Sequence, residues 1–78
     1  MKIKLNTIND VHDFVLICNK YQETEIYVKQ GKQMIDGRSI LGIFSLNLLE
    51  PLYVTIDTGE KTPQNNFYLD IKKWEELY

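Results

Sequence analysis

MIDGRSILGIFSLNLLEPLYVTI, residues 34–56, is the stretch that decides the fold of this chain. A strand-like run leads through a turn at Gly37-Arg38 into a short apolar helix. Asn47 follows this helix, and asparagine can adopt the left-handed conformation that ends one. Pro51 then opens a strand in which every second residue is apolar. The stretch therefore predicts a strand, a helix and a second strand in immediate succession.

Ser39 lies between the turn and the first apolar residue of the short helix. The first four backbone N–H groups of a helix have no partner inside it, and a serine hydroxyl can accept a hydrogen bond from one of them. Such N–H groups also favour a phosphate by ~0.3–1 kcal/mol, and Arg38 adds a positive charge beside it. Ser39 is therefore predicted to cap the helix and is a candidate for phosphorylation.

The N-terminal third of the chain changes from a strand pattern to a helix pattern. Ile3 and Leu5 alternate with lysines, as in a half-buried first strand. The apolar residues between positions 11 and 18 then follow a helical period, which predicts a helix from about Ile8 to Tyr21. Residues Thr7 and Asp10 have the spacing of a capping box before it.

A hairpin and a last helix complete the order. Residues 25–29 alternate, Gln30-Gly31 supply a turn, and residues 33–36 return as a short strand. Thr62-Pro63 have the pattern of a cap followed by proline at the first helical position. The last apolar stripe consists of Phe67, Ile71, Trp74 and Tyr78.

Size and composition indicate that residues 1–78 form one small domain. They favour a binding or carrier function and disfavour an enzyme. A chain of 78 residues is too short to enclose a deep, water-excluding pocket. The N-terminus alternates like a strand instead of carrying a signal peptide, and no apolar run approaches the ~20 residues that span a bilayer, so a cytoplasmic protein is expected. The net charge of −2 gives no electrostatic reason to expect nucleic acid or a membrane as partner.

The single cysteine, Cys18, cannot form an internal disulfide. It lies on the apolar side of the first predicted helix, which favours a small buried hydrophobic residue over a reactive thiol. The sequence has neither a glycine-rich fingerprint nor the spacing of a metal site. We therefore expect no cofactor and no metal.

The predicted order βαββαβα gives an α+β fold, an open-faced β-sandwich in which three helices cover one face of a four-stranded antiparallel sheet. A ferredoxin-like domain shares this order up to the fourth strand, and its sheet face could stack RNA bases on Tyr27 and Tyr53. The third strand, Gln33–Asp36, lacks the basic and aromatic run of such RNA-binding domains, which disfavours this alternative.

Three short motifs resemble HPr, the small histidine-phosphorylated carrier of the bacterial sugar phosphotransferase system. They are Arg38-Ser39, Leu46-x-Leu48 and Val54-Thr55-Ile56, in the same order as in that family. The resemblance implies the HPr fold, and it implies that Ser39 matches a regulatory phosphorylation site of many Gram-positive members. It also implies that Ile40, Leu41 and Phe44 match a surface that docks on partner proteins.

The histidine that carries the phosphoryl group in HPr has no equivalent under this alignment. The resemblance places Ile8 at the histidine position and Asp10 at the position of an arginine that balances the phosphate charge. Isoleucine has no nucleophilic nitrogen, and a carboxylate repels a phosphoryl group. The one histidine, His12, is expected inside the helix, where its backbone N–H is already used, and so it reads as a solvent-facing residue.

The sequence therefore favours a non-catalytic, HPr-like interaction or regulatory domain, with protein partners among phosphotransferase-system or transcription-regulatory proteins. In lacking the histidine and keeping the serine, it is similar to the catabolite-repression HPr homologues. Two alternatives stay open. One is a true phosphohistidine carrier that uses His12, and the other is a small self-associating domain without phosphate chemistry.

Overall fold

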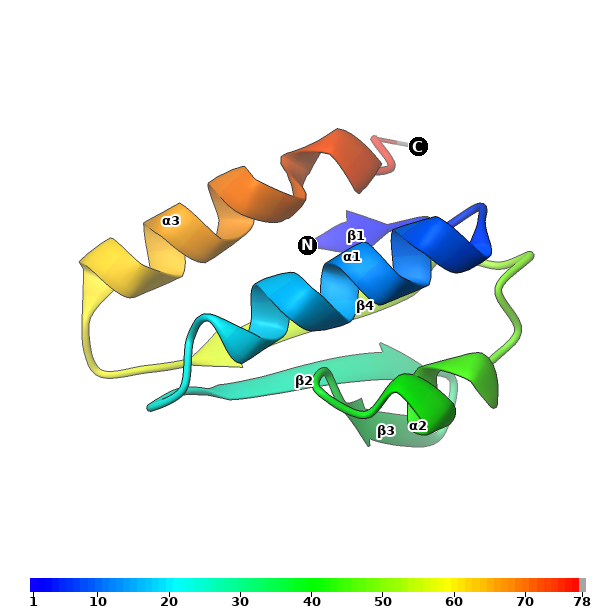
Figure 1. The fold of residues 1–78 in the computed structure, drawn as a ribbon, viewed down its shortest axis with the longest axis horizontal. Coiled ribbons are helices and arrows are strands. Elements are labelled where there is room, and N and C mark those ends of the chain that lie inside the picture. Colours follow the sequence, from blue (N-terminus) through cyan, green and yellow to red (C-terminus); the bar gives the residue numbers. More distant parts are fainter. Residues whose placement is uncertain (78) are drawn as a thin grey trace.

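Four strands form one antiparallel sheet in the computed structural model, which describes residues 1–77 (Figure 1). They are β1 (Lys2–Ile3), β2 (Glu25–Gln30), β3 (Gln33–Asp36) and β4 (Leu52–Asp57), in the spatial order β1-β4-β2-β3. Three helices, α1 (Ile8–Asn19), α2 (Ile40–Phe44) and α3 (Lys61–Ile71), lie on one face of this sheet, and a short 3₁₀ turn η1 (Lys72–Trp74) follows α3. The predicted open-faced α+β sandwich is confirmed.

The core lies between the sheet and the helices. Every second residue of β2 and β4 points toward the helices and is buried, as the alternation in the sequence requires. The predicted apolar stripes of α1 and of residues 67–74 meet these side chains, and the Phe14 and Trp74 rings pack edge to face with 6.1 Å between centroids. The buried helical residues are Val11, Phe14, Val15, Cys18, Ile43, Phe67, Ile71 and Trp74. Among residues 1–77, no helix is long and apolar enough to span a bilayer.

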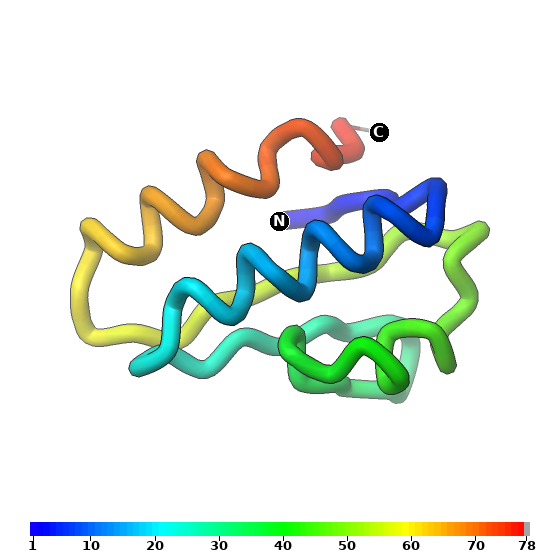
Figure 2. Tube along the Cα trace, in the orientation of Figure 1, coloured from blue at the N-terminus to red at the C-terminus, as the bar shows by residue number. Residues whose placement is uncertain are grey.

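The C-terminal segment continues the sheet beyond β1. The backbone N–H of Lys4 donates to the Trp74 carbonyl at 2.9 Å, and the N–H of Glu76 donates to the Lys2 carbonyl at 2.8 Å. Ile3 and Glu75 form an antiparallel bridge between these two bonds. The tube in Figure 2 shows the two ends of the chain brought together in this way. The edge of β1 is therefore covered by the chain itself.

Two predicted helix ends are wrong. Helix α1 ends at Asn19 instead of Tyr21, because the next two backbone N–H groups donate three residues back: Lys20 to the Ile17 carbonyl at 3.0 Å and Tyr21 to the Cys18 carbonyl at 3.2 Å. Asn47 is not left-handed, since no non-glycine residue among positions 1–77 has a positive φ. Its backbone N–H instead donates to Gln30 Oε1 at 2.8 Å, which ties the chain after α2 to β2.

The start of α3 also differs from the prediction. Glu60 is the N-cap residue and Lys61 the first helical residue, so that Thr62-Pro63 lie within the first turn. Proline is tolerated there because the first N–H groups of a helix have no partner in any case. Tyr78, expected at the end of the last apolar stripe, lies outside the described residues.

Helix α2 lies unusually close to β3. A Cβ atom added at Gly42 would come within 2.5 Å of Ile35 Cγ2 and 2.9 Å of Ser39 Oγ. The glycine therefore allows this short helix to rest directly on the edge strand of the sheet.

We expect Gly42→Ala to lower the free energy of unfolding by about 1–3 kcal/mol, since the new methyl group must displace Ile35 or the helix. The higher helix propensity of alanine, about 1 kcal/mol, works against this loss. Gly59→Ala is the matched control, because a Cβ there meets nothing within 4 Å. Denaturant unfolding of the two variants checks the prediction, and equal stability of both would contradict it.

Candidate functional site

Ser39 caps α2, as the sequence predicts. Its backbone is extended, with φ −93° and ψ 99°, and its Oγ accepts a hydrogen bond from the Gly42 N–H at 3.1 Å. Asp36 fixes the turn that precedes α2. Its backbone carbonyl accepts a hydrogen bond from the Ser39 N–H at 3.0 Å, and its Oδ1 accepts one from the Arg38 N–H at 2.8 Å. The Ser39 residue is exposed, so the capping hydroxyl remains open to solvent.

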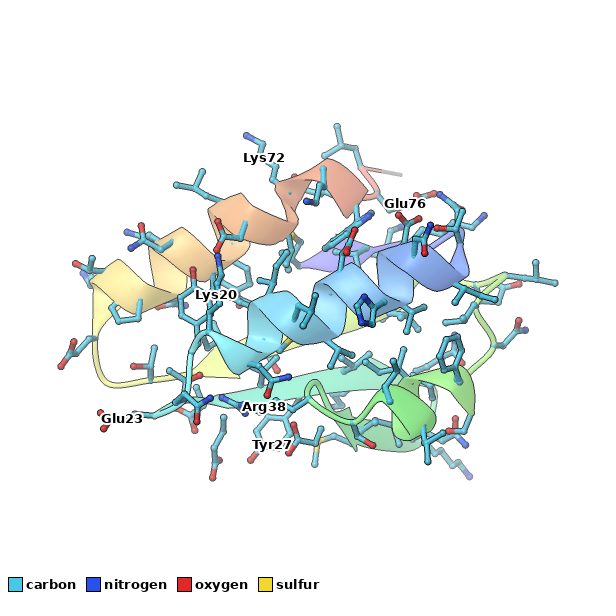
Figure 3. The ribbon with its side chains drawn as sticks, in the orientation of Figure 1. Lys20, Glu23, Tyr27, Arg38, Lys72 and Glu76 are labelled. Atoms are coloured by element: carbon cyan, nitrogen blue, oxygen red, sulfur yellow. The ribbon has the colours of Figure 1, made fainter. Side chains whose placement is uncertain are left out.

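The Arg38 side chain turns to the loop between α1 and β2. Its Nη2 donates to the Thr24 carbonyl at 2.8 Å and to the Tyr21 carbonyl, and its side chain is 23% exposed. Figure 3 shows Arg38 reaching toward the loop that carries Glu23. The expected contact of Arg38 with a phosphate on Ser39 stays a prediction, and it would require release of these two backbone carbonyls.

Helix α2 presents an apolar outer face. Leu41 is 81% exposed and Phe44 is 40% exposed, and their i,i+3 spacing places them on the same side of the helix. Ile40 is half-buried and packs against the core, while Ile43 is fully buried. The exposed part of the predicted docking set is therefore Leu41 and Phe44, with Ile40 as their support.

The start of α1 is closed by a reciprocal capping box, as the sequence predicts. The Asp10 N–H donates to Thr7 Oγ1 at 3.0 Å, and Asp10 Oδ2 accepts from the backbone N–H groups of Asn6 at 3.0 Å and Thr7 at 3.2 Å. The hydrogen bond from Asn6 is the largest of the effects that lower the pKa of Asp10. A carboxylate therefore binds the two backbone N–H groups that immediately precede the first helical residue, Ile8.

His12 is exposed on α1, in the second turn of the helix. At this position its backbone N–H belongs to the i→i−4 ladder. The described part of the chain shows no group of three or more His, Cys, Asp or Glu residues that could hold a metal. Burial raises the pKa of the Cys18 thiol to about 12, so this cysteine stays protonated.

The candidate site lies apart from the two grooves that the structure describes. Each of these open grooves has a volume of about 480 Å³, and one lies between Met1 and α3 and the other between the α1–β2 loop and the start of α3. Neither is lined by Ser39, Leu41 or Phe44. Beside the second groove, Asp70 links α3 to the end of α1, a contact that the sequence did not reveal. Its Oδ2 accepts a hydrogen bond from the Tyr21 hydroxyl and forms an ion pair with Lys20 Nζ at 3.0 Å.

Two solved structures have a fold similar to that of this chain. HPr-C-His from Thermoanaerobacter tengcongensis superposes with a TM-score of 0.73 and 20% sequence identity, covering 99% of this chain and 97% of that one. The phosphocarrier protein HPr from Bacillus anthracis str. Ames superposes with a TM-score of 0.67 and 13% identity, covering 96% and 94%. This chain has the HPr fold. No protein-family model and no curated protein sequence matches it.

On this HPr fold, the position that the resemblance gives to the phosphohistidine is Ile8, the first residue of α1. Its side chain is 74% exposed and carries no group that can accept a phosphoryl group. The neighbouring N–H groups already bind the Asp10 carboxylate. The structure thus brings Ser39, Leu41 and Phe44 together on α2, while Arg38 is directed to another part of the molecule.

We expect Ser39→Ala to lower the free energy of unfolding by about 0.5–2 kcal/mol, because the Gly42 N–H loses its acceptor. Ser39→Asp should stay close to the wild type, since a carboxylate can accept the same hydrogen bond. Thermal unfolding of both variants checks this. A Ser39→Asp variant much less stable than Ser39→Ala would contradict the prediction and argue against a tolerated phosphate.

Proposed function

We propose that this chain is a non-catalytic, HPr-like interaction domain that docks on partner proteins through Leu41 and Phe44 of α2. We further propose that Ser39 is its regulatory phosphorylation site. The observation that carries the proposal is an exposed apolar pair beside an exposed serine on one rigidly held helix. The matching positions in HPr, according to the resemblance, serve docking and regulation.

The packing of α2 supports a preformed docking surface. Ile43 is fully buried and Leu46 nearly so, which fixes the rotation of the helix about its axis. Leu41 and Phe44 must then face solvent, where their apolar surface gains ~25 cal/mol per Å² when a partner covers it, before ordering costs. Because the helix is already held, a partner need not order it on binding.

The position of Ser39 supports control of that surface by phosphorylation. A phosphate adds about −1.5 to −2 charges and three acceptor oxygens at the end of the helix that carries Leu41 and Phe44. Such a charge disfavours an apolar partner and favours one that offers arginine or lysine beside an apolar contact. The modification would thus change which partner binds without changing the fold.

The resemblance to HPr places the partners among proteins of the sugar phosphotransferase system or of transcription regulation. A cytoplasmic location goes with this proposal. The net charge of −2 offers no attraction to nucleic acid, and an apolar pair on a short helix suits a protein surface.

The competing function is a phosphohistidine carrier that uses His12, which is exposed on α1. In the HPr family the phosphoimidazole is stabilised by free N–H groups at the start of that helix. Here the N–H groups of Asn6 and Thr7 bind Asp10, and His12 lies a full turn further into the helix. This geometry favours the non-catalytic function.

We expect no acid-labile phosphorylation when the chain is incubated with phosphoenolpyruvate and the general phosphotransferase enzyme. The physical reason is the lack of free N–H donors around His12. An HPr carrier in the same reaction is the positive control. Stoichiometric labelling that disappears in His12→Ala would establish the carrier function and refute our proposal.

We expect Leu41→Ser and Phe44→Ser to weaken capture of partner proteins from the native cytoplasm, with Leu41→Ser leaving the melting temperature nearly unchanged. Leu41 is 81% exposed, so little buried contact is lost in the free domain, whereas Phe44 is 40% exposed and its variant should lose more stability than Leu41→Ser but less than a variant of a fully buried ring. Phe14→Ala, which removes a fully buried ring, is the stability control and should cost about 3–5 kcal/mol. Unchanged capture by both serine variants, measured in pull-downs, would remove the docking proposal.

A further inference from the structure

The sheet face that points away from the helices is uncovered (Figure 1). The side chains on this face belong to the alternate residues that are not in the core, and several are large. Tyr53 is 53% exposed and Met34 is 58% exposed, and Tyr27 lies beside them on β2. The outward residues of the three longer strands are Glu25, Tyr27, Lys29, Met34, Asp36, Tyr53, Thr55 and Asp57.

The strand register orders these residues into rows across the sheet. Lys2, Tyr53, Lys29 and Met34 are cross-strand neighbours in one row. Thr55, Tyr27 and Asp36 form the next row, and Asp57 and Glu25 form the last. The face therefore carries lysines with Tyr53 in the row at one end of the strands, Tyr27 and Asp36 in the middle row, and only carboxylates in the row at the other end.

We propose that this open sheet face is an interface for a second copy of the chain. In the pair, the two sheets stack face to face and a two-fold axis runs across the strands through the Tyr27 row. Such an axis reverses the strand direction and keeps β2 opposite β2. It therefore places the cationic end of each copy on the acidic end of the other.

The contacts that follow are specific. Lys29 of each copy lies opposite Glu25 of its partner, and Tyr53 lies opposite the partner's Asp57, whose carboxylate can accept from the phenol. Tyr27 stacks against its own symmetry mate, as residues near a two-fold axis do. Asp36, in the same row on β3, also lies opposite its own mate, and this like-charged contact weakens the pair. Stacked sheets lie about 10 Å apart and within about 30° of alignment, a spacing that these side chains fill.

One hydrogen bond within a single copy positions the Glu25 carboxylate for pairing with Lys29 of the other copy. The Tyr27 hydroxyl donates to Glu25 Oε2 at 2.5 Å, which holds the carboxylate on the open face. This bond to Glu25 is also the main reason that the pKa of Tyr27 is raised. The carboxylate opposite Lys29 is thus already positioned in the single copy.

The geometry predicts a weak pair. Strands β2 and β4 have six residues each, β3 has four and β1 has two. At about 3.3 Å per residue and about 4.8 Å between strands, the face is therefore smaller than a square of roughly 20 Å by 20 Å. Roughly 800 Å² is an upper limit for the area that the pair buries in total, below the ~1,200–2,000 Å² of stable interfaces. Because its ion pairs are at the surface, the association should weaken as salt rises. Nucleic acid is the less suited occupant, since Glu25, Asp36 and Asp57 would repel its phosphates.

The test is a concentration series of the full chain at low salt, from micromolar to millimolar, followed by sedimentation and amide chemical shifts. We expect reversible dimers and shifts confined to β2, β3 and β4. Lys29→Glu and Glu25→Lys should each weaken self-association about tenfold, since each puts two like-charged pairs into the dimer. Asp13→Lys, a charge reversal at an exposed position of α1 on the helix side, is the matched control and should associate as the wild type does.

Two further samples separate pairing from loss of folding. An equimolar mixture of Lys29→Glu and Glu25→Lys should associate again, because both cross-pairs then have opposite charges. The double variant Lys29→Glu/Glu25→Lys should likewise recover dimers. A monomer at every concentration, mixtures that do not recover, or shifts caused by single-stranded nucleic acid on this face instead would each overturn the proposal.

Discussion

The close approach of residues 37–42 to the sheet is the constraint on which the candidate site depends. A Cβ at Gly37 would lie 2.7 Å from Ile26 Cγ2 and 3.1 Å from Cys18 Sγ, and the Gly37 N–H donates to the Ile26 carbonyl at 2.8 Å. The turn is thus held against both β2 and α1. With Gly42 resting on Ile35, the short helix α2 has one available orientation, with Ile43 in the core. A helix of five residues would not be stable alone, so its exposed apolar pair exists because the sheet holds the backbone beneath it.

The entry to α1 differs in charge from the phosphohistidine site that the resemblance to HPr implies for this position. In an HPr-type carrier, as the resemblance implies, the charge at this helix end arrives and leaves with the phosphoryl group. Here Asp10 supplies a permanent negative charge to the N–H groups of Asn6 and Thr7. The lowered pKa of Asp10 keeps this charge in place at any pH above its ordinary range. The start of the helix is therefore stabilised by the chain's own side chains.

The order of elements could be predicted because it depends on local signals. Period-two and helical patterns, the Thr7–Asp10 box and the Ser39 cap all act over a few residues, and the structure confirms each of them. Two errors are local, since α3 begins after Glu60 and not after Thr62, and α1 ends at Asn19 because the next N–H groups donate three residues back. The other differences concern contacts between distant positions. The Tyr21 hydroxyl donates to Asp70, 49 residues away, and Asn47 is held by Gln30, 17 residues away. Sequence adjacency suggests that Arg38 would contact a phosphate on Ser39. The orientation of the Arg38 side chain instead depends on where the Tyr21 and Thr24 carbonyls lie in space, and adjacency does not show that.

The two exposed surfaces of this domain differ in their physical character, because they come from different sides of one core. The α2 surface is apolar and rigid, so its affinity for a partner should depend on covered area and little on salt. The sheet surface mixes tyrosines with ordered charges, so its contacts should be sensitive to ionic strength. The sheet itself separates the two, since the side chains of each strand alternate between them. A phosphate on Ser39 would therefore act on the helix side and leave the sheet side unchanged, so the proposed docking and the proposed self-association would be independent of each other.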